Sequence, residues 1–205
     1  MRLKLKVCGM RIPSNIAEVV QLQPDYLGFI FYKQSKRYID GLPVEVVRGL
    51  PEKIKKTGVF VDEGLDEVIE AIRVYNLDAV QLHGTECPAY CRKLMAQGVE
   101  VIKAFGVDEE FDFQVLSNYE EAVDYFLFDT KTLGHGGSGK TFSWSLLKKY
   151  TLATPYFLSG GIGLEELSEV VTSLNDGRLY GVDVNSRFET EPGLKDIEKL
   201  KAIRL

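Results

Sequence analysis

The sequence predicts an α/β protein, a closed (β/α)8 barrel that forms a single domain over residues 1–205. Short apolar runs rich in β-branched residues alternate with amphipathic segments along the whole chain, as expected for consecutive βα units around a parallel sheet. Eight such runs are present, and no segment between them resembles a linker. A length of 205 residues lies near the lower limit for this fold, which leaves little room for a second domain.

Each expected strand is a short run bounded by turn residues. In chain order the strands are Leu3–Val7, Tyr26–Phe31, Thr57–Val61, Ala79–Leu82, Glu100–Phe105, Tyr125–Phe128, Tyr156–Leu158 and Tyr180–Val184. Between them, apolar residues at helical spacing predict helices such as Leu65–Tyr75 and Glu165–Leu174. Pro43 is expected just inside the second helix, because the first helical turn tolerates proline.

Composition and charge exclude several classes of protein. No apolar run approaches the roughly 20 residues of a membrane helix, and the alternating start from Met1 to Val7 lacks the apolar core of a signal peptide. Three cysteines, an odd number, favour free thiols in a reducing compartment, so we expect a cytoplasmic protein. A net charge of −5 without a basic stripe gives a nucleic-acid partner no support. Cys87 and Cys91 lie one helical turn apart, but with two histidines in the chain we expect packing and no metal site.

A (β/α)8 barrel places its functional residues just after the strands, at the C-terminal face. Cys8 follows the first strand, where it is either a reactive thiol at the mouth of the barrel or a small buried side chain. Asp129 follows the sixth strand. Its apolar surroundings could keep the carboxyl partly protonated and make it a general acid, although an aspartate that caps a loop is the alternative.

Other strand ends add polar candidates. The planar fork of Arg37 suits a carboxylate or phosphate, unless the side chain is simply solvated. Gln81 and His83 end the fourth strand and should point to the same side. Lys103 ends the fifth strand, where it either forms a Schiff base with a carbonyl substrate or pairs with a carboxylate. The last two strands precede loops of the kind that bind phosphate through backbone N–H groups, with candidates Ser159, Gly160, Gly161, Asp183, Asn185 and Ser186.

One motif indicates a different class of protein, the P-loop nucleotide-binding proteins. Residues Gly134–Thr141 match the Walker A pattern of nucleotide-binding P-loops. The match lies in the sixth βα unit with about 65 residues remaining, and Asp183 is the only later candidate for a Mg²⁺-binding aspartate. We therefore expect a glycine-rich loop that closes over substrate, with Lys140 as at most a loop anchor or a distant contact to the substrate.

Seven motifs appear in order at the expected strand ends. They are Lys6-Val-Cys-Gly-Met-Arg11, Gly28-Phe-Ile-Phe-Tyr32 with Ser35 and Arg37, Gly58-Val-Phe-Val61, Val80-Gln-Leu-His-Gly84, Asp129 with Gly136-Gly-Ser-Gly-Lys-Thr-Phe142 and Trp144, Leu158-Ser-Gly-Gly161, and Gly181-Val-Asp-Val-Asn-Ser186. Together they resemble the phosphoribosylanthranilate isomerase family of tryptophan biosynthesis over nearly the whole chain.

The resemblance implies an Amadori rearrangement of N-(5-phosphoribosyl)anthranilate to 1-(2-carboxyphenylamino)-1-deoxyribulose 5-phosphate, without a metal or an organic cofactor. It implies Cys8 as general base, Asp129 as general acid and Arg37 as the residue that orients the anthranilate moiety. The remaining implied substrate contacts are backbone groups near Gly160, Gly161, Asn185 and Ser186 for the phosphate, and Gln81, His83 and Asp183 in the pocket. The expected partner is this small molecule, and the expected assembly is a monomer or a homodimer.

The sequence departs from the family's pattern at a few positions. Many relatives have a small residue in place of Arg187 and often a serine in place of Asn185. Ser143 stands where relatives often have an aspartate, and either residue caps a helix well.

Two nearer alternatives remain at this point. Phosphosugar isomerases of the histidine pathway, or dual-substrate enzymes, typically use two aspartates as acid and base, which the thiol of Cys8 argues against. A catalytically silent barrel is the other alternative, and the presence of both Cys8 and Asp129 argues against that.

Overall fold

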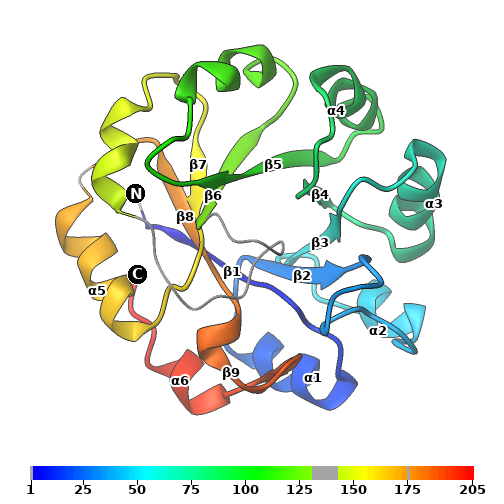
Figure 1. Cartoon of the computed structure of the whole chain (residues 1–205). Coiled ribbons are helices and arrows are strands. Elements are labelled where there is room, and N and C mark those ends of the chain that lie inside the picture. Colours follow the sequence, from blue (N-terminus) through cyan, green and yellow to red (C-terminus); the bar gives the residue numbers. More distant parts are fainter. Residues whose placement is uncertain (1, 131–142, 175) are drawn as a thin grey trace.

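The eight predicted strands form a closed parallel barrel in the computed structural model, which describes residues 2–130, 143–174 and 176–205 (Figure 1). Each strand pairs with the next along the chain, and β1 pairs with β8 to close the barrel. The strands are β1 (Lys4–Val7), β2 (Tyr26–Ile30), β3 (Lys55–Phe60), β4 (Ala79–Leu82), β5 (Glu100–Val107), β6 (Tyr125–Thr130), β7 (Tyr156–Leu158) and β8 (Leu179–Val184). The predicted fold class is therefore confirmed, and β4 and β7 have the predicted bounds.

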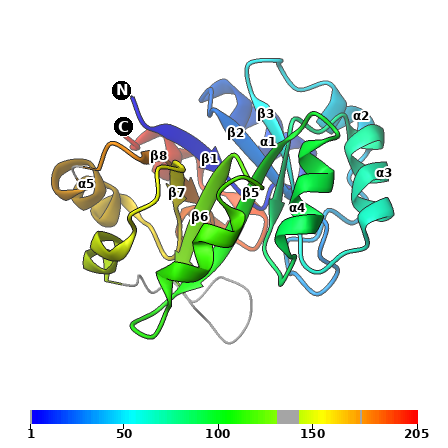
Figure 2. The ribbon, with the colours of Figure 1, turned by 90° about the horizontal axis from the view of Figure 1, so that it is seen from above.

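Helices lie around the outside of the barrel (Figures 1 and 2). They are α1 (Pro13–Gln21), α2 (Val44–Arg48), α3 (Leu65–Tyr75), α4 (Pro88–Met95), α5 (Leu164–Ser173) and α6 (Ile197–Lys201), with 3-10 helices η1 (Phe113–Tyr119), η2 (Trp144–Lys149) and η3 (Ser186–Phe188). The helix predicted over Leu65–Tyr75 is confirmed, whereas α5 begins one residue before the predicted start. Pro43 was expected inside α2 and instead is its N-cap residue, with extended backbone. No helix among the described residues has the length and apolar character that crossing a membrane requires.

A short hairpin follows β8 before the chain enters its last helix. Strand β9 (Glu189–Glu191) pairs antiparallel with β10 (Leu194–Lys195), and α6 begins two residues later. This hairpin is not predicted from the sequence, because its two strands are too short and too polar to show period-2 alternation. In the structure the hairpin lies against α1, where Asn15 binds the backbone of Lys195.

The interior of the barrel has an aromatic lower part, at the N-terminal ends of the strands, and a polar upper part, at their C-terminal ends. The buried lower cluster consists of Tyr26, Ala79, Ile102, Ala104, Leu127 and Phe157, with Tyr125 and Tyr180 packed against it. Alternate residues of a strand point to the same face, so the next inward positions on these strands lie one layer higher. Those positions hold Gly28, Gln81, Asp129 and Ser159, which places the polar groups at the C-terminal ends of the strands.

Candidate active site

A cavity of about 570 Å³ opens at the C-terminal ends of the strands. This volume is typical of sites for small molecules. The ten site residues that the family resemblance implies all line it: Cys8, Arg37, Gln81, His83, Asp129, Gly160, Gly161, Asp183, Asn185 and Ser186. The apolar side chains of Ile30, Val59, Val61 and Ile162 complete one part of the wall, and Lys36 and Arg187 add positive charge to the rim.

Cys8 stands at the end of β1 and is only 4% exposed. The adjacent strand leaves room for its thiol because it has a glycine at this level. A Cβ on Gly28 would lie 2.8 Å from Cys8 Sγ and 3.1 Å from Cys8 Cα, both too close. The thiol is therefore buried but still faces the cavity.

Buried charges surround the Cys8 thiol. Lys6, fully buried on the same strand, donates a hydrogen bond of 2.7 Å to Oδ1 of Asp183 on β8. Burial raises the pKa of the Cys8 thiol, and the charge of Asp183 adds to this effect, whereas the ammonium groups of Lys6 and Lys195 oppose it. Although burial by itself would lower the pKa of Lys6, the charges of Asp183 and Cys8 raise it. Lys6 is thus an ammonium beneath the thiol.

Asp129 lies in the last part of β6, buried on the opposite side of the cavity mouth from Cys8. Its Oδ1 accepts a hydrogen bond of 2.8 Å from the backbone N–H of Thr130. Its Oδ2 lies 3.4 Å from Nε2 of His83, while Nδ1 of the same ring lies 3.0 Å from Nε2 of Gln81. A Gln81 amide that donates to Nδ1 keeps the proton of the neutral ring on Nε2, which faces Asp129. The prediction that Gln81 and His83 point to the same side is confirmed.

The loop after β7 requires glycine for its backbone. Gly160 and Gly161 have φ angles of +89° and +66°, in the left-handed region that favours glycine. A Cβ on Gly160 would also lie 2.8 Å from Oδ1 of Asp129. The loop leads into α5, whose N-cap is Gly163. Backbone N–H groups at such a turn, next to a helix N-terminus, form a suitable site for an anion.

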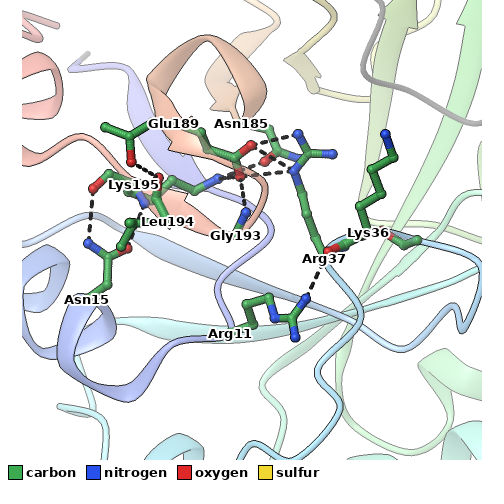
Figure 3. Close-up of polar contacts among 11 residues, drawn as sticks. Arg11, Asn15, Lys36, Arg37, Asn185, Glu189, Gly193, Leu194 and Lys195 are labelled. Atoms are coloured by element: carbon green, nitrogen blue, oxygen red, sulfur yellow. Dashed lines mark hydrogen bonds and ion pairs between the residues drawn. The ribbon is translucent and has the colours of Figure 1, made fainter.

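Arg37 forms an ion pair, which contradicts the alternative that its side chain is simply solvated. Its Nε donates to Oε1 and Oε2 of Glu189 at 2.9 and 3.0 Å, and its Nη2 donates to Oε2 at 2.6 Å (Figure 3). Lys195 Nζ donates to Oε1 of the same carboxylate at 2.6 Å and to Oδ1 of Asn185 at 2.7 Å. The sequence did not indicate a role for Glu189, Lys195 or Lys6. Lys6 opens the first of the seven motifs without a role of its own, whereas Glu189 and Lys195 carry no motif signal and reach the site only through the short hairpin.

Lys103 does not belong to the cavity. It lies in β5 between Ile102 and Ala104, which face the barrel interior, so its side chain points toward the surrounding helices. The buried ammonium lies 3.2 Å from Oε2 of Glu86 and donates to the carbonyl oxygens of Leu82, Gly84 and Ala104 at 3.1, 2.8 and 3.0 Å. Burial lowers its pKa, and Glu86 opposes that effect. The structure thus supports the ion-pair alternative over the Schiff base.

Neither metal binding nor a P-loop gains support in the described part of the chain. No group of three or more histidine, cysteine, aspartate or glutamate side chains is arranged to hold a metal ion there. Cys91 is buried as expected, whereas Cys87 is exposed at the start of α4. Residues Gly134–Thr141, with Lys140, lie outside the described residues. The strand before them belongs to a closed barrel, not to the open sheet that P-loop proteins use.

Comparisons with known proteins agree on one family. The model of the family described as N-(5'-phosphoribosyl)anthranilate (PRA) isomerase matches residues 5–204. The N-(5'-phosphoribosyl)anthranilate isomerase of Parabacteroides distasonis is 48% identical over 199 residues, which cover 96% of this chain and 90% of the relative. A crystal structure of phosphoribosyl anthranilate isomerase from Thermotoga maritima superimposes with a TM-score of 0.83 at 37% identity, covering 98% of this chain and 96% of the other.

A second solved structure, 33% identical with a TM-score of 0.80, covers 98% of this chain and 96% of its own. It is a phosphoribosyl anthranilate isomerase in complex with reduced 1-(o-carboxyphenylamino)-1-deoxyribulose 5-phosphate.

Proposed function

This chain belongs to the phosphoribosylanthranilate isomerase family and is an isomerase of tryptophan biosynthesis, and we propose that Cys8 and Asp129 carry out the proton transfers of its reaction. The substrate is N-(5-phosphoribosyl)anthranilate and the product is 1-(2-carboxyphenylamino)-1-deoxyribulose 5-phosphate. The observation that carries the assignment of roles is that both side chains, from strands β1 and β6, face one cavity that also contains Arg37 and the glycine loop.

The two ends of the substrate fit two parts of the cavity. Backbone N–H groups of the loop at Gly160 and Gly161, with the start of η3 at Ser186, receive the phosphate. Arg37 binds the carboxylate of the anthranilate ring by donating charge-assisted hydrogen bonds to it. A related isomerase binds a reduced product analogue with both of these groups, which supports the same ligand class here.

The reaction begins with ring opening. Asp129, in its acid form, donates a proton to the furanose ring oxygen as the C1–O bond breaks. The lone pair of the substrate's own amine forms the iminium at C1, so the reaction needs no lysine adduct. The thiolate of Cys8 then removes the proton from C2, and the C–H electron pair forms the C1–C2 double bond of an enolamine. Tautomerisation of the enolamine gives the ketone.

The position of Asp129 suits this role. Its carboxyl group is buried, and it contacts His83, which helps to fix its direction. Gly160 lets the loop after β7 approach the carboxyl closely, so the acid and the phosphate-binding loop share one wall.

The test replaces each proton-transfer group by a near-isostere. We expect Cys8→Ser and Asp129→Asn each to lower kcat by about 10²- to 10⁴-fold, while the Kd for the reduced product analogue changes by only a few fold. The assay is the loss of fluorescence of freshly generated phosphoribosylanthranilate, and Cys87→Ser, at an exposed helix start, is the matched control. A variant with near-normal turnover would exclude its residue from the mechanism.

The remaining assignments concern the whole chain. We propose that residues 1–205 act as one domain, in the cytoplasm, as a monomer or a homodimer. A phosphoribosylanthranilate isomerase from Thermotoga maritima is described as dimeric, and the described residues here include only two exposed large hydrophobic side chains, Val115 and Leu164. Light scattering distinguishes the two states, because a monomer has a mass of 23.1 kDa.

A further inference from the structure

The carboxylate of Glu189 lies at the centre of a buried polar cluster beside the cavity (Figure 3). Its side chain is 4% exposed, yet it accepts hydrogen bonds from three residues. Arg37 donates through two nitrogens, Lys195 through Nζ and Gly193 through its backbone N–H at 3.1 Å. Burial by itself would raise the pKa of Glu189, but the hydrogen bonds and charges of Arg37 and Lys195 hold it below its usual value. Burial lowers the pKa of Lys195, and the charge of Glu189 and its hydrogen bond oppose that effect.

The contact with Glu189 uses one edge of the Arg37 guanidinium and leaves the other edge open. Nε and one hydrogen of Nη2 are directed at Glu189. A guanidinium has five N–H donors in a rigid plane, so Nη1 and the second hydrogen of Nη2 stay available as a parallel pair. Arg37 lines the cavity, and the absence of a side chain at Gly9 lets its stem pass, since a Cβ there would lie 2.7 Å from Arg37 Cδ. This free pair matches the geometry of a carboxylate.

The same cluster sets the direction of the Asn185 amide. A lysine ammonium can only donate, and Lys195 donates to Oδ1 of Asn185. The oxygen of the amide is thereby turned to Lys195, which leaves Nδ2 as the atom that can donate to a ligand. Lys195 is itself held in place, because Asn15 accepts from its backbone N–H at 2.7 Å and donates to its carbonyl oxygen at 3.0 Å.

We propose that Glu189 is a positioning residue for substrate recognition: it aims the free edge of Arg37 at the anthranilate carboxylate and, through Lys195, turns the amide N–H groups of Asn185 toward the phosphate end. The proposal rests on the roles given above to Arg37 and Asn185. It assigns Glu189 no contact with the substrate and no proton transfer. Its effect is therefore on affinity and on discrimination for the carboxylate.

The experiment compares two ligands that differ only in the carboxylate. One is reduced 1-(o-carboxyphenylamino)-1-deoxyribulose 5-phosphate, and the other is the same compound without the carboxyl group. Calorimetry gives the Kd of each for wild type, Glu189→Gln and Arg37→Met. We expect wild type to prefer the carboxylated ligand by at least about tenfold and both variants to lose most of that preference. With substrate, Glu189→Gln should raise KM by a similar factor and keep kcat within a few fold.

A variant of Lys195 separates the two proposed effects of Glu189, the orientation of Arg37 and the orientation of the Asn185 amide. Lys195→Met leaves the pair of Arg37 and Glu189 intact but removes the hydrogen bond that orients the Asn185 amide. We expect this variant to weaken both ligands by the same factor and to keep the preference for the carboxylate. A loss of preference in Lys195→Met would show that Lys195 and not Glu189 positions Arg37.

The matched control is a second bidentate arginine–carboxylate pair outside the cavity. Arg178 donates through Nε and Nη2 to the two oxygens of Asp176 at 2.8 and 2.7 Å, just before β8 and away from the strands' C-terminal ends. Asp176→Asn removes the same kind of contact and should leave both Kd values unchanged. An equal effect of Asp176→Asn and Glu189→Gln would reduce Glu189 to a general contribution to folding.

The outcomes distinguish the failure of this inference from the failure of its premise. If Arg37→Met loses the carboxylate preference and Glu189→Gln keeps it, Glu189 does not position Arg37. If Glu189→Gln increases the preference, Glu189 competes with the ligand for Arg37, and the inference is wrong. If Arg37→Met keeps the preference, the role proposed for Arg37 fails and the inference fails with it. Should Glu189→Gln not fold, Glu189→Asp keeps the charge with a shorter reach and should lose the preference in the same way.

Discussion

At the scale of single residues, the environment of Cys8 combines burial with access to the cavity. The thiol is closed in by the barrel wall, and its neighbours are a glycine on β2 and two buried lysines, Lys6 and Lys195. Free buried cysteines usually act as small apolar side chains. Here the charges of Lys6 and Lys195 oppose the effect of burial on the pKa of the thiol, which the sequence motif could not show.

Gly28→Ala tests how tightly the thiol is placed. The added Cβ would lie within 3.2 Å of three Cys8 atoms, so Cys8 must move. We expect kcat to fall by at least about tenfold, because small displacements of a reacting group are costly. Gly177→Ala, in open space, is the control for the glycine change itself. Unchanged kcat in Gly28→Ala would show that the thiol tolerates displacement.

The pKa of Cys8 predicts how the thiolate fraction of the free enzyme depends on pH. The base is the thiolate, and burial raises the pKa of this thiol above the ordinary value of 9.0. The thiolate fraction in the free enzyme is then small at neutral pH and grows with pH. We expect the ultraviolet absorbance of the Cys8 thiolate in the free enzyme, taken as the difference between wild type and Cys8→Ser, to rise steadily between about pH 6.5 and 8.5. A flat profile over this range would indicate a thiolate that already exists at neutral pH. Lys6→Met should move the rise to higher pH.

At the scale of elements, the hairpin of β9 and β10 connects the last strand of the barrel to the first helix. Lys195 in β10 is clamped through its backbone by Asn15 in α1, and its side chain reaches Asn185 just after β8. Strand positions followed from alternation, since each strand is a short apolar run with one face in the barrel. The hairpin did not follow, because two polar strands of three and two residues have no such pattern.

Asn15→Ala tests the clamp between α1 and the hairpin. The change removes two hydrogen bonds and leaves the N–H and carbonyl of Lys195 without these partners in a buried place. We expect the free energy of unfolding to fall by about 2–4 kcal/mol, measured by urea denaturation. Asn118→Ala, at an exposed position with one side-chain hydrogen bond to Val115, should cost less than about 0.5 kcal/mol. Equal, small losses in the two variants would show that the clamp adds little stability.

At the scale of the whole molecule, the barrel separates stability from function along its axis. Aromatic side chains fill the lower interior, where the ring of Phe157 lies 5.3 Å from that of Tyr26, 5.5 Å from Tyr125 and 5.2 Å from Tyr180. An ion pair between Lys55 and Glu100 lies beside them, with Tyr26 donating to Glu100 at 3.1 Å. The cavity with its charged groups occupies the other end. This division is typical of (β/α)8 barrels.

Phe157→Ala tests that division. The ring is fully buried, so its loss leaves a cavity in the lower interior and should lower the free energy of unfolding by about 3–5 kcal/mol. KM and kcat at a temperature where the variant is folded should stay within a few fold of wild type. Phe157→Leu should lose less stability. A large change in KM without a loss of stability would show that the two ends of the barrel are coupled.

The fold class, the order of the eight strands and the group of residues that meet at their C-terminal ends can all be predicted from the chain before it is folded. These follow from local chemistry, because period-2 and helical spacing, and the place of a residue just after a strand, are all visible within a few positions. The contacts that support the site are visible only in the folded protein. Lys6 meets Asp183 across 177 positions, Arg37 meets Glu189 across 152, and Asn15 meets Lys195 across 180. Closure of β8 onto β1 creates these pairs, and contacts between distant segments leave no periodic trace in the residues themselves.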